Sequence, residues 1–437
     1  RPFLSAKPSS SSSSSHRRAV FAPIPKVSQI ALINEPMVTG TSAVDALSPL
    51  GRGQNMLLVG QSGTGKRGVA IDAVAAQVRA GDKGVKCVYA LTSTNARDRK
   101  EALRRLEEAG VLDEIVVVSA RDNVEGSESG DEVGSAEAVA VAAAACAVGE
   151  SFALSSGADS LVIVDDIDRH KALWDWTTRV LVDVYGVDAV VKDDREGGAS
   201  SEMRGYYSAL IQRAGKFNKA KGGGSVTLMM LSNIPGRGGD DEETVFQPED
   251  FDGASQKVKD RIAILVKSKI PLTPVNLRKI QIPVPSASES ECDRLLALQH
   301  ADDLISMTDG QIWLDETLKA GGRRPPLDPQ RSITRVGVGA DTNSRADAPA
   351  LRGLIGGLRF ELAQAADILK RAVSADLTKA ERKQLIKRDA WLLALHQETG
   401  RARSLSESVV SLLAASIGQL DDVIEKGGTA GTELGMG

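Results

Sequence analysis

The sequence predicts an α/β fold, in which a mostly parallel sheet is covered by helices and followed by a C-terminal α-helical domain. Three observations predict it. Apolar strand-like runs alternate with helical segments between residues 55 and 233, a glycine-rich loop separates the first strong strand from its helix, and apolar residues recur at 3–4 spacing from about residue 350. Such alternation is typical of parallel sheets with both faces covered.

Each element has its own pattern. Short, apolar, strand-like runs occupy residues 55–60, 86–92, 113–120, 159–168 and 225–233. Helical segments between them occupy residues 67–81, 99–110 and 135–153. In the first helical segment, one face carries Ala70, Ala73, Val74, Gln77 and Val78.

The domain organisation follows from changes in this pattern. We expect a transit peptide or disordered tail over 1–28, a nucleotide-binding domain over 29–339, a helical domain over 340–427 and a flexible tail over 428–437. Two polar or proline-broken stretches, 185–204 and 236–300, look like inserts, and the second resembles a small β-excursion. Ser404 and Glu407 can form a capping box in the helical domain.

Composition excludes several classes of function. The 437 residues carry a net charge of only −4 and 3% aromatic residues, so neither a basic nucleic-acid surface nor base-stacking platforms are indicated. The three cysteines and four histidines are far apart in sequence, which argues against a metal cluster and favours buried thiols. Because no apolar run approaches the ~20 residues of a membrane span, we expect membrane association only through partners.

The first residues have an unusual composition. They contain seven consecutive serines and several basic residues, and the first acidic residue is Glu35. This composition suits an organelle transit peptide, and the serine run favours a plastid over a mitochondrion. An ordinary disordered tail is the alternative.

The loop GQSGTGKRG, Gly60–Gly68, nearly matches the phosphate-binding pattern G-x-x-x-x-G-K-[ST]. Backbone N–H groups of such a loop and the following helix N-terminus bind phosphate oxygens, and Lys66 would reach the outer phosphates. The candidate nucleotide-binding residues are therefore Gly60, Gly63, Thr64, Gly65, Lys66, Arg67 and Gly68. A structural relic of a phosphate loop is the alternative.

Three residues, a pair of aspartates and Arg67, bear on a metal ion. Asp165 and Asp166 end an apolar strand, where a carboxylate can hold Mg²⁺, although an aspartate there can also cap the next helix. Arg67 stands where a Ser or Thr hydroxyl would bind Mg²⁺, and a guanidinium is only a donor. Arg67 could pair with a phosphate or with Asp165, or point to solvent; metal-assisted hydrolysis is doubtful either way.

Arg335, taken alone, reads as a surface arginine.

Several segments together resemble the alpha subunit of the rotary ATP synthase catalytic head. They are EPMVTGTSAVDALSPLGRGQ before the loop, LVIVDDID, GGGSVTLMML, ISMTDGQIWLDETL, RRPPLDPQRSITRVG and LRFELAQAADILKRA. The paired aspartates of LVIVDDID and the SITRVG segment favour the alpha over the beta type. The resemblance covers roughly Glu35 to Lys426, with breaks at the two inserts.

This resemblance implies a RecA-like core in a hexamer with beta subunits around gamma, and alpha sites that bind ATP or ADP with Mg²⁺ without turning it over. It implies a metal role for Asp165, an adenine-side segment at Arg324 and Pro325, and in Arg335 the arginine that alpha lends to the neighbouring catalytic site.

The chain also departs from the family. Arg67 replaces a threonine, QSG replaces a more polar loop interior, and TSTNARD replaces a Gly-Gln-Lys run. With some 34 residues before Glu35, we expect the family's N-terminal β-barrel to be absent. Three hypotheses follow: a non-catalytic alpha-type subunit, a diverged paralogue acting as a binding or assembly protein, and a free-standing motor ATPase, which the missing hydroxyl disfavours.

Overall fold

A computed structural model describes most of the chain. The described residues are 18–81, 85–93, 95–120, 131–186, 198–235, 289–336, 354–372 and 377–425, with a few single positions between 258 and 272. Most of the predicted 236–300 insert and the centre of the 185–204 insert lie outside these residues.

The described sheet is mostly parallel, as predicted. Its main path runs β11-β10-β4-β9-β7-β5-β6, and within it only the β10–β11 pair is antiparallel. Short β1 and β8 extend it beside β9. The strands are β1 Ile30–Ala31, β4 Asn55–Gly60, β5 Lys86–Leu91, β6 Val116–Ser119, β7 Ser160–Asp165, β8 Gly215–Phe217, β9 Ser225–Asn233, β10 Gly310–Leu314 and β11 Ile333–Thr334, with a separate β2 Pro36–Met37 and β3 Leu50–Gly51 pair.

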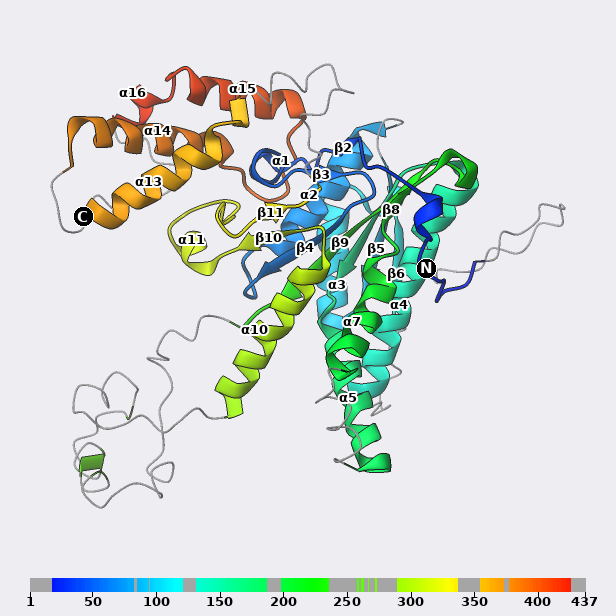
Figure 1. The fold of residues 1–437 in the computed structure, drawn as a ribbon. Coiled ribbons are helices and arrows are strands. Elements are labelled where there is room, and N and C mark those ends of the chain that lie inside the picture. The colour runs from blue at the N-terminus through cyan, green and yellow to red at the C-terminus, as the bar shows by residue number, and fades with distance from the viewer. Residues whose placement is uncertain are drawn as a thin grey trace.

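Helices cover both faces of this sheet and form the C-terminal region (Figure 1). They are α1 Ser42–Leu47, α2 Lys66–Arg79, α3 Ala96–Glu108, α4 Asp131–Ser151, α5 Asp168–Tyr185, α7 Gly198–Ile211, α10 Glu289–Met307, α11 Glu316–Ala320, α13 Leu358–Ala372, α14 Lys379–Leu395, α15 Leu405–Ser416 and α16 Asp421–Glu425. The predicted strands and helices thus correspond to observed elements, with small differences at their ends.

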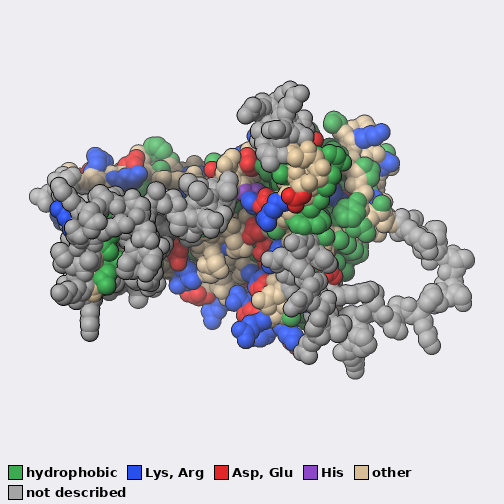
Figure 2. Space-filling view, turned by 90° about the horizontal axis from the view of Figure 1, so that it is seen from below, with side chains coloured by type: hydrophobic (Ala, Val, Ile, Leu, Met, Phe, Trp, Pro, Cys, Tyr) green, Lys and Arg blue, Asp and Glu red, His purple; other side chains and the backbone are tan. Residues whose placement is uncertain are grey.

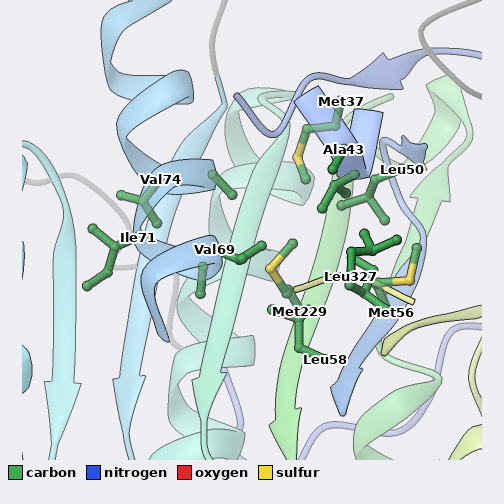
Figure 3. Packing of buried hydrophobic residues seen from close by; sticks show 14 of the residues in the cluster. Met37, Ala43, Leu50, Met56, Leu58, Val69, Ile71, Val74, Met229 and Leu327 are labelled. Carbon is green, nitrogen blue, oxygen red and sulfur yellow. The ribbon is translucent and has the colours of Figure 1, made fainter. Parts of the chain in front are cut away.

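Two hydrophobic cores lie on opposite faces of the sheet, because successive strand residues point to opposite sides. In β4, Met56 and Leu58 belong to the core under α2, whereas Leu57 and Val59 belong to the core under α4, α7 and α10. Figure 3 shows Val69 of α2 on the same side of the sheet as Leu58.

The C-terminal helices join the first of these cores. Trp391 and Leu412 are buried in it together with residues of α1 and α2. The Ser42 amide donates to Gln397 Oε1 at 3.0 Å, and the Gly400 amide donates to Asp72 Oδ1 at 2.9 Å. The predicted capping box of Ser404 and Glu407 is present at the start of α15. The helical region is therefore docked on the helix that follows the glycine-rich loop.

Three expectations meet findings of the structure. The predicted inserts include residues 198–204 and 289–300, which belong to α7 and α10; Tyr207 and Leu304 of these helices are buried against the sheet. Of the predicted tail 1–28, residues 1–17 lie outside the described residues, and the Val20 carbonyl accepts from Arg213 Nη1 at 2.8 Å. The segment Gly134–Ser156 is long and apolar enough to cross a membrane, contrary to our expectation, although more than half of its apolar window is buried.

Helix α5 carries an exposed apolar stripe. It consists of Trp176, Val180, Leu181, Val184 and Tyr185. In Figure 1, α5 extends beyond the sheet. Figure 2, seen from below, shows hydrophobic side chains gathered at the surface on the side of the molecule where α5 protrudes.

A ring cluster joins α5, α7 and α10. Tyr207 packs between His170 and His300, with ring centroids 6.3 and 5.2 Å away, and Tyr206 packs against His170. The Nδ1 atoms of both histidines are buried without a partner in the structure. Burial lowers the pKa of both imidazoles to about 4; the neighbouring His300 adds to the effect on His170, and the Lys171 ammonium adds to the effect on His300. The folded chain therefore holds both rings neutral.

This cluster predicts a pH-dependent difference between the wild type and a histidine variant. Between pH 6.5 and 4 the unfolded chain takes up protons on these histidines while the folded chain does not, so their contribution to the free energy of unfolding falls as pH falls. Each imidazole contributes about 1 kcal/mol per pH unit. Urea unfolding of the wild type and of His170→Phe from pH 7 to 4.5 isolates this contribution, because carboxyls with raised pKa, such as Asp166, act in both proteins; the variant should gain stability relative to the wild type as pH falls. An equal slope in the variant would contradict this account.

Candidate functional site

The glycine-rich loop has the geometry of a phosphate loop. It connects the carboxyl end of β4 to the N-terminus of α2. Gly63 and Gly65 have φ values of +76° and +101°, a region that favours glycine, and Gly65 is the N-cap of α2. A Cβ on Gly60 would lie 2.5 Å from the Leu314 carbonyl oxygen. The glycines therefore serve the loop conformation and its contact with β10.

Lys66 is folded back onto this loop. Its Nζ donates to the carbonyl oxygens of Gly60 and Gln61 at 2.6 and 2.8 Å. Burial lowers the pKa of Lys66 to about 8, although the carboxylates of Asp168 and Asp166 oppose the shift. The ammonium group lies at the helix N-terminus and can turn from two neutral carbonyls to a phosphate oxygen.

The remaining loop contacts are structural. Thr64 is buried, and its hydroxyl donates to the Gln61 carbonyl at 2.8 Å. Gln61 is buried too, and its side chain accepts from the Glu316 amide. Lys319 Nζ donates to the Gly63 carbonyl at 2.8 Å. Helix α11 thus supports the loop from the side of β10.

Gly68 serves packing against the C-terminal region. A Cβ on Gly68 would lie 2.7 Å from Thr399 Cγ2. The glycine therefore allows the loop after α14 to approach the first turn of α2. This packing is a second reason for a glycine at position 68, beside its predicted role in nucleotide binding.

Arg67 forms a clamp with two carboxylates. Its Nε and Nη2 donate to Asp165 at 2.5 and 3.2 Å, and its Nη1 and Nη2 donate to Asp98 at 2.9 and 3.2 Å. Tyr89 donates its hydroxyl to the same Asp165 carboxylate at 2.8 Å. Of the possibilities for Arg67 considered from the sequence, the structure shows pairing with Asp165.

The hydrogen bonds of this clamp favour the ionised forms of Arg67 and Asp98. Burial opposes the charge on Arg67, but its hydrogen bonds to Asp165 and Asp98 outweigh burial and raise the pKa of the guanidinium. Burial likewise opposes ionisation of Asp98, and the bonds from Arg67 outweigh it and lower the pKa of that carboxyl. The result is a stable ion cluster with one cation between two anions.

Two more carboxylates stand beside the clamp. Asp168 accepts from Ser232 Oγ and the Asn233 amide at 2.9 Å each, and Asp166 accepts from the Asp168 amide at 3.2 Å. Burial, then repulsion from Asp168 and Asp165, raises the pKa of Asp166 to about 7. Burial also raises the pKa of Asp168.

The residues present do not fit a Mg²⁺ ion in the usual place. Arg67 stands in place of the residue whose hydroxyl would bind the ion. The carboxylate of Asp165 already accepts hydrogen bonds from Arg67 and Tyr89. Among the described residues, no group of three or more His, Cys, Asp or Glu side chains is arranged to hold a metal ion. The sequence-based metal role of Asp165 therefore disagrees with its contacts.

Arg324 and Pro325 line a small pocket away from the loop. The pocket lies between α1, α11, α13 and α14, and its walls include Leu47, Leu392 and Leu395. Arg324 Nη1 donates to the carbonyl of Lys319, the residue that also holds Gly63. Helix α11 thus connects the pocket to the glycine-rich loop.

Arg335 and the glycine-rich loop lie at opposite ends of the strands. Arg335 follows β11, whose Thr334 pairs with Gly310 at the start of β10. The loop begins at Gly60, which pairs with Leu314 at the end of β10. Its side chain is exposed and donates to the Thr308 carbonyl at 3.0 Å. The structure therefore does not bring Arg335 to the loop of its own chain.

This geometry agrees with comparisons to known proteins. Residues 40–182, which contain the loop, Asp98 and Asp165, match the family model for the ATP synthase alpha/beta family, nucleotide-binding domain. This part of the chain is therefore similar to the nucleotide-binding domain of that family. The predicted α/β phosphate-loop fold with a helical C-terminal region is confirmed.

The chain is also similar to ATP synthase alpha subunits over most of its own length. It is 30% identical over 392 residues to ATP synthase subunit alpha of Mannheimia succiniciproducens, covering 90% of this chain and 62% of that protein. It is 27% identical over 409 residues to ATP synthase subunit alpha 1 of Methylococcus capsulatus, covering 92% and 65%. The chain thus spans less than two thirds of the length of these relatives.

Sequence reasoning missed two residues of the candidate site. Asp98 was read only as the end of the TSTNARD run, and Tyr89 only as part of a strand. Both lie near the carboxyl ends of neighbouring β5 and β7, where Leu91 pairs with Asp165. The signal that could have found Asp98 is an acid shortly after a strand that is parallel and adjacent to the Asp165 strand.

Proposed function

We propose that this chain is an alpha-type, non-catalytic subunit of an organelle proton-translocating ATP synthase, which binds ATP or ADP at a degenerate phosphate loop. The observation that carries the proposal is the combination of an intact loop geometry and Lys66 with a guanidinium on Asp165. Backbone amides at the N-terminus of α2 and Lys66 would bind the phosphates. Arg324 and Pro325 would border the base.

Hydrolysis at this site is not expected. Metal-assisted phosphoryl transfer needs a cation between the phosphates and the protein carboxylates, and here Arg67 occupies those carboxylates. The same reasoning disfavours the free-standing motor ATPase. Arg335 is exposed at the end of the strands opposite the loop, and it would act on the site of a neighbouring beta subunit.

Nucleotide binding is tested by calorimetry on the full chain. We expect ATP to bind with similar affinity in Mg²⁺ and in EDTA, because the clamp leaves little place for the ion. Lys66→Ala should weaken binding about tenfold or more, since it removes a charge-assisted contact worth ~1.5–3 kcal/mol. Lys319→Ala serves as a comparison, because Lys319 is also a lysine that donates to a loop carbonyl, that of Gly63, but it lies on α11 and not in the loop. Unchanged affinity in Lys66→Ala would refute the phosphate-loop assignment.

A diverged paralogue acting as a binding or assembly protein is the second candidate, favoured by the closed clamp of Arg67 with Asp98 and Asp165. The two candidates differ in whether the chain enters the hexamer. Copurification of the tagged chain with beta and gamma subunits supports the first, and recovery only outside the complex supports the second. A plastid, with a mitochondrion as the alternative, is tested by import into each isolated organelle.

A further inference from the structure

We propose that Asp98 is a positioning residue that occupies two N–H groups of Arg67 and thereby keeps them from contacting the phosphates of a bound nucleotide. This inference rests on the proposed nucleotide site. It assigns to Asp98 the control of how strongly the loop binds phosphate when no metal is present.

Asp98 is placed for this role by the start of α3. Asn95 caps that helix by accepting from the Arg97 amide at 2.9 Å, so Asp98 lies in the first turn. Both of its oxygens accept from Arg67, at 2.9 and 3.2 Å, in the fork geometry that guanidinium and carboxylate groups prefer. The carboxylate therefore fixes the plane of the guanidinium as well as its position.

The donor count shows what Asp98 controls. A guanidinium has five N–H groups, and Arg67 uses Nε–H, both Nη2–H groups and one Nη1–H in its four bonds to Asp165 and Asp98. One N–H remains. Without Asp98, the two bonds to Asp165 would persist and three N–H groups would be free. Because Arg67 is the second residue of α2, directly after Lys66, these groups would lie beside the bound phosphates.

The test is nucleotide affinity in EDTA. Asp98→Asn should bind ATP about tenfold more tightly than the wild type, because released N–H groups make charge-assisted bonds to phosphate oxygens. Asp98→Glu, which retains a carboxylate able to pair with Arg67, should return the affinity toward that of the wild type. Glu101→Gln is the matched control, since it removes a carboxylate from the same helix that pairs with Arg104 and Arg105 instead.

A double-mutant cycle separates release of Arg67 from simple loss of negative charge. In the Arg67→Gln background, Asp98→Asn still removes the charge but frees no guanidinium, so its gain should largely vanish. A gain of the same size in both backgrounds would overturn the inference, and so would Asp98→Asn binding no more tightly than the wild type. Circular dichroism and thermal unfolding establish that each variant is folded.

These outcomes are distinguishable from failure of the proposed function. If the wild type binds no ATP but Asp98→Asn does, the natural chain is not a nucleotide-binding subunit, while the positioning role of Asp98 stands. If both bind with equal affinity and Lys66→Ala does not, the nucleotide site stands and the role of Asp98 is refuted.

Discussion

Arg67→Thr should make nucleotide binding depend on Mg²⁺. The substitution removes the guanidinium from Asp165 and supplies a hydroxyl at the position where a phosphate loop coordinates the ion. The freed carboxylate is almost fully buried, with its side chain 4% exposed, and needs a cation. We expect ATP to bind about ten- to a hundredfold more tightly in Mg²⁺ than in EDTA, against a ratio near one for the wild type.

A control variant separates the effect of the hydroxyl from the loss of the guanidinium. Arg67→Ala frees Asp165 in the same way but offers no hydroxyl, so its Mg²⁺ dependence should be smaller than that of Arg67→Thr. Calorimetric titration of each variant with ATP, with and without Mg²⁺, measures both. A wild-type chain that already requires Mg²⁺, or an Arg67→Thr variant indifferent to it, would show that Arg67 does not take the place of the ion.

Arg213→Met should cause the largest loss of stability. Arg213 is 1% exposed, and its Nε donates to the equally buried Glu150 at 2.6 Å. Its Nη1 donates to the Val20 and Ala143 carbonyls at 2.8 and 2.9 Å. Removing one partner of a buried ion pair leaves an uncompensated charge and costs about 3–5 kcal/mol. Here Arg18 also bonds Glu150, so we expect the lower end of that range.

Urea unfolding at pH 7 measures this loss. The double variant Arg213→Met with Glu150→Met should recover part of it, because no buried charge is then left without a partner. The N-terminal residues 18–20 should also become more accessible to protease in Arg213→Met, since their carbonyl contact is lost. A loss below about 1 kcal/mol would contradict the assignment of a buried ion pair.

Much of the fold could be predicted because it is encoded locally. The apolar run of β4, the alternation of its side chains between two cores and the helical face of α2 follow from period and composition over a few residues. The helices at residues 198–204 and 289–300 were not predicted, because polar and apolar residues of α7 and α10 become a helical face only against the sheet they cover.

The candidate site divides in the same way. The sequence by itself determined the glycine-rich loop, Lys66, the acid-ended strand of Asp165 and the presence of an arginine in place of a hydroxyl. Only the tertiary structure decided what Arg67 binds, because Asp98 and Asp165 are 67 residues apart and meet through the pairing of β5 with β7. It also decided that Arg213 and Glu150 form a buried pair and that His170 and His300 flank one tyrosine. Local patterns specify which segments become strands and helices, whereas the partner of a long charged side chain depends on which strand ends the sheet order places side by side.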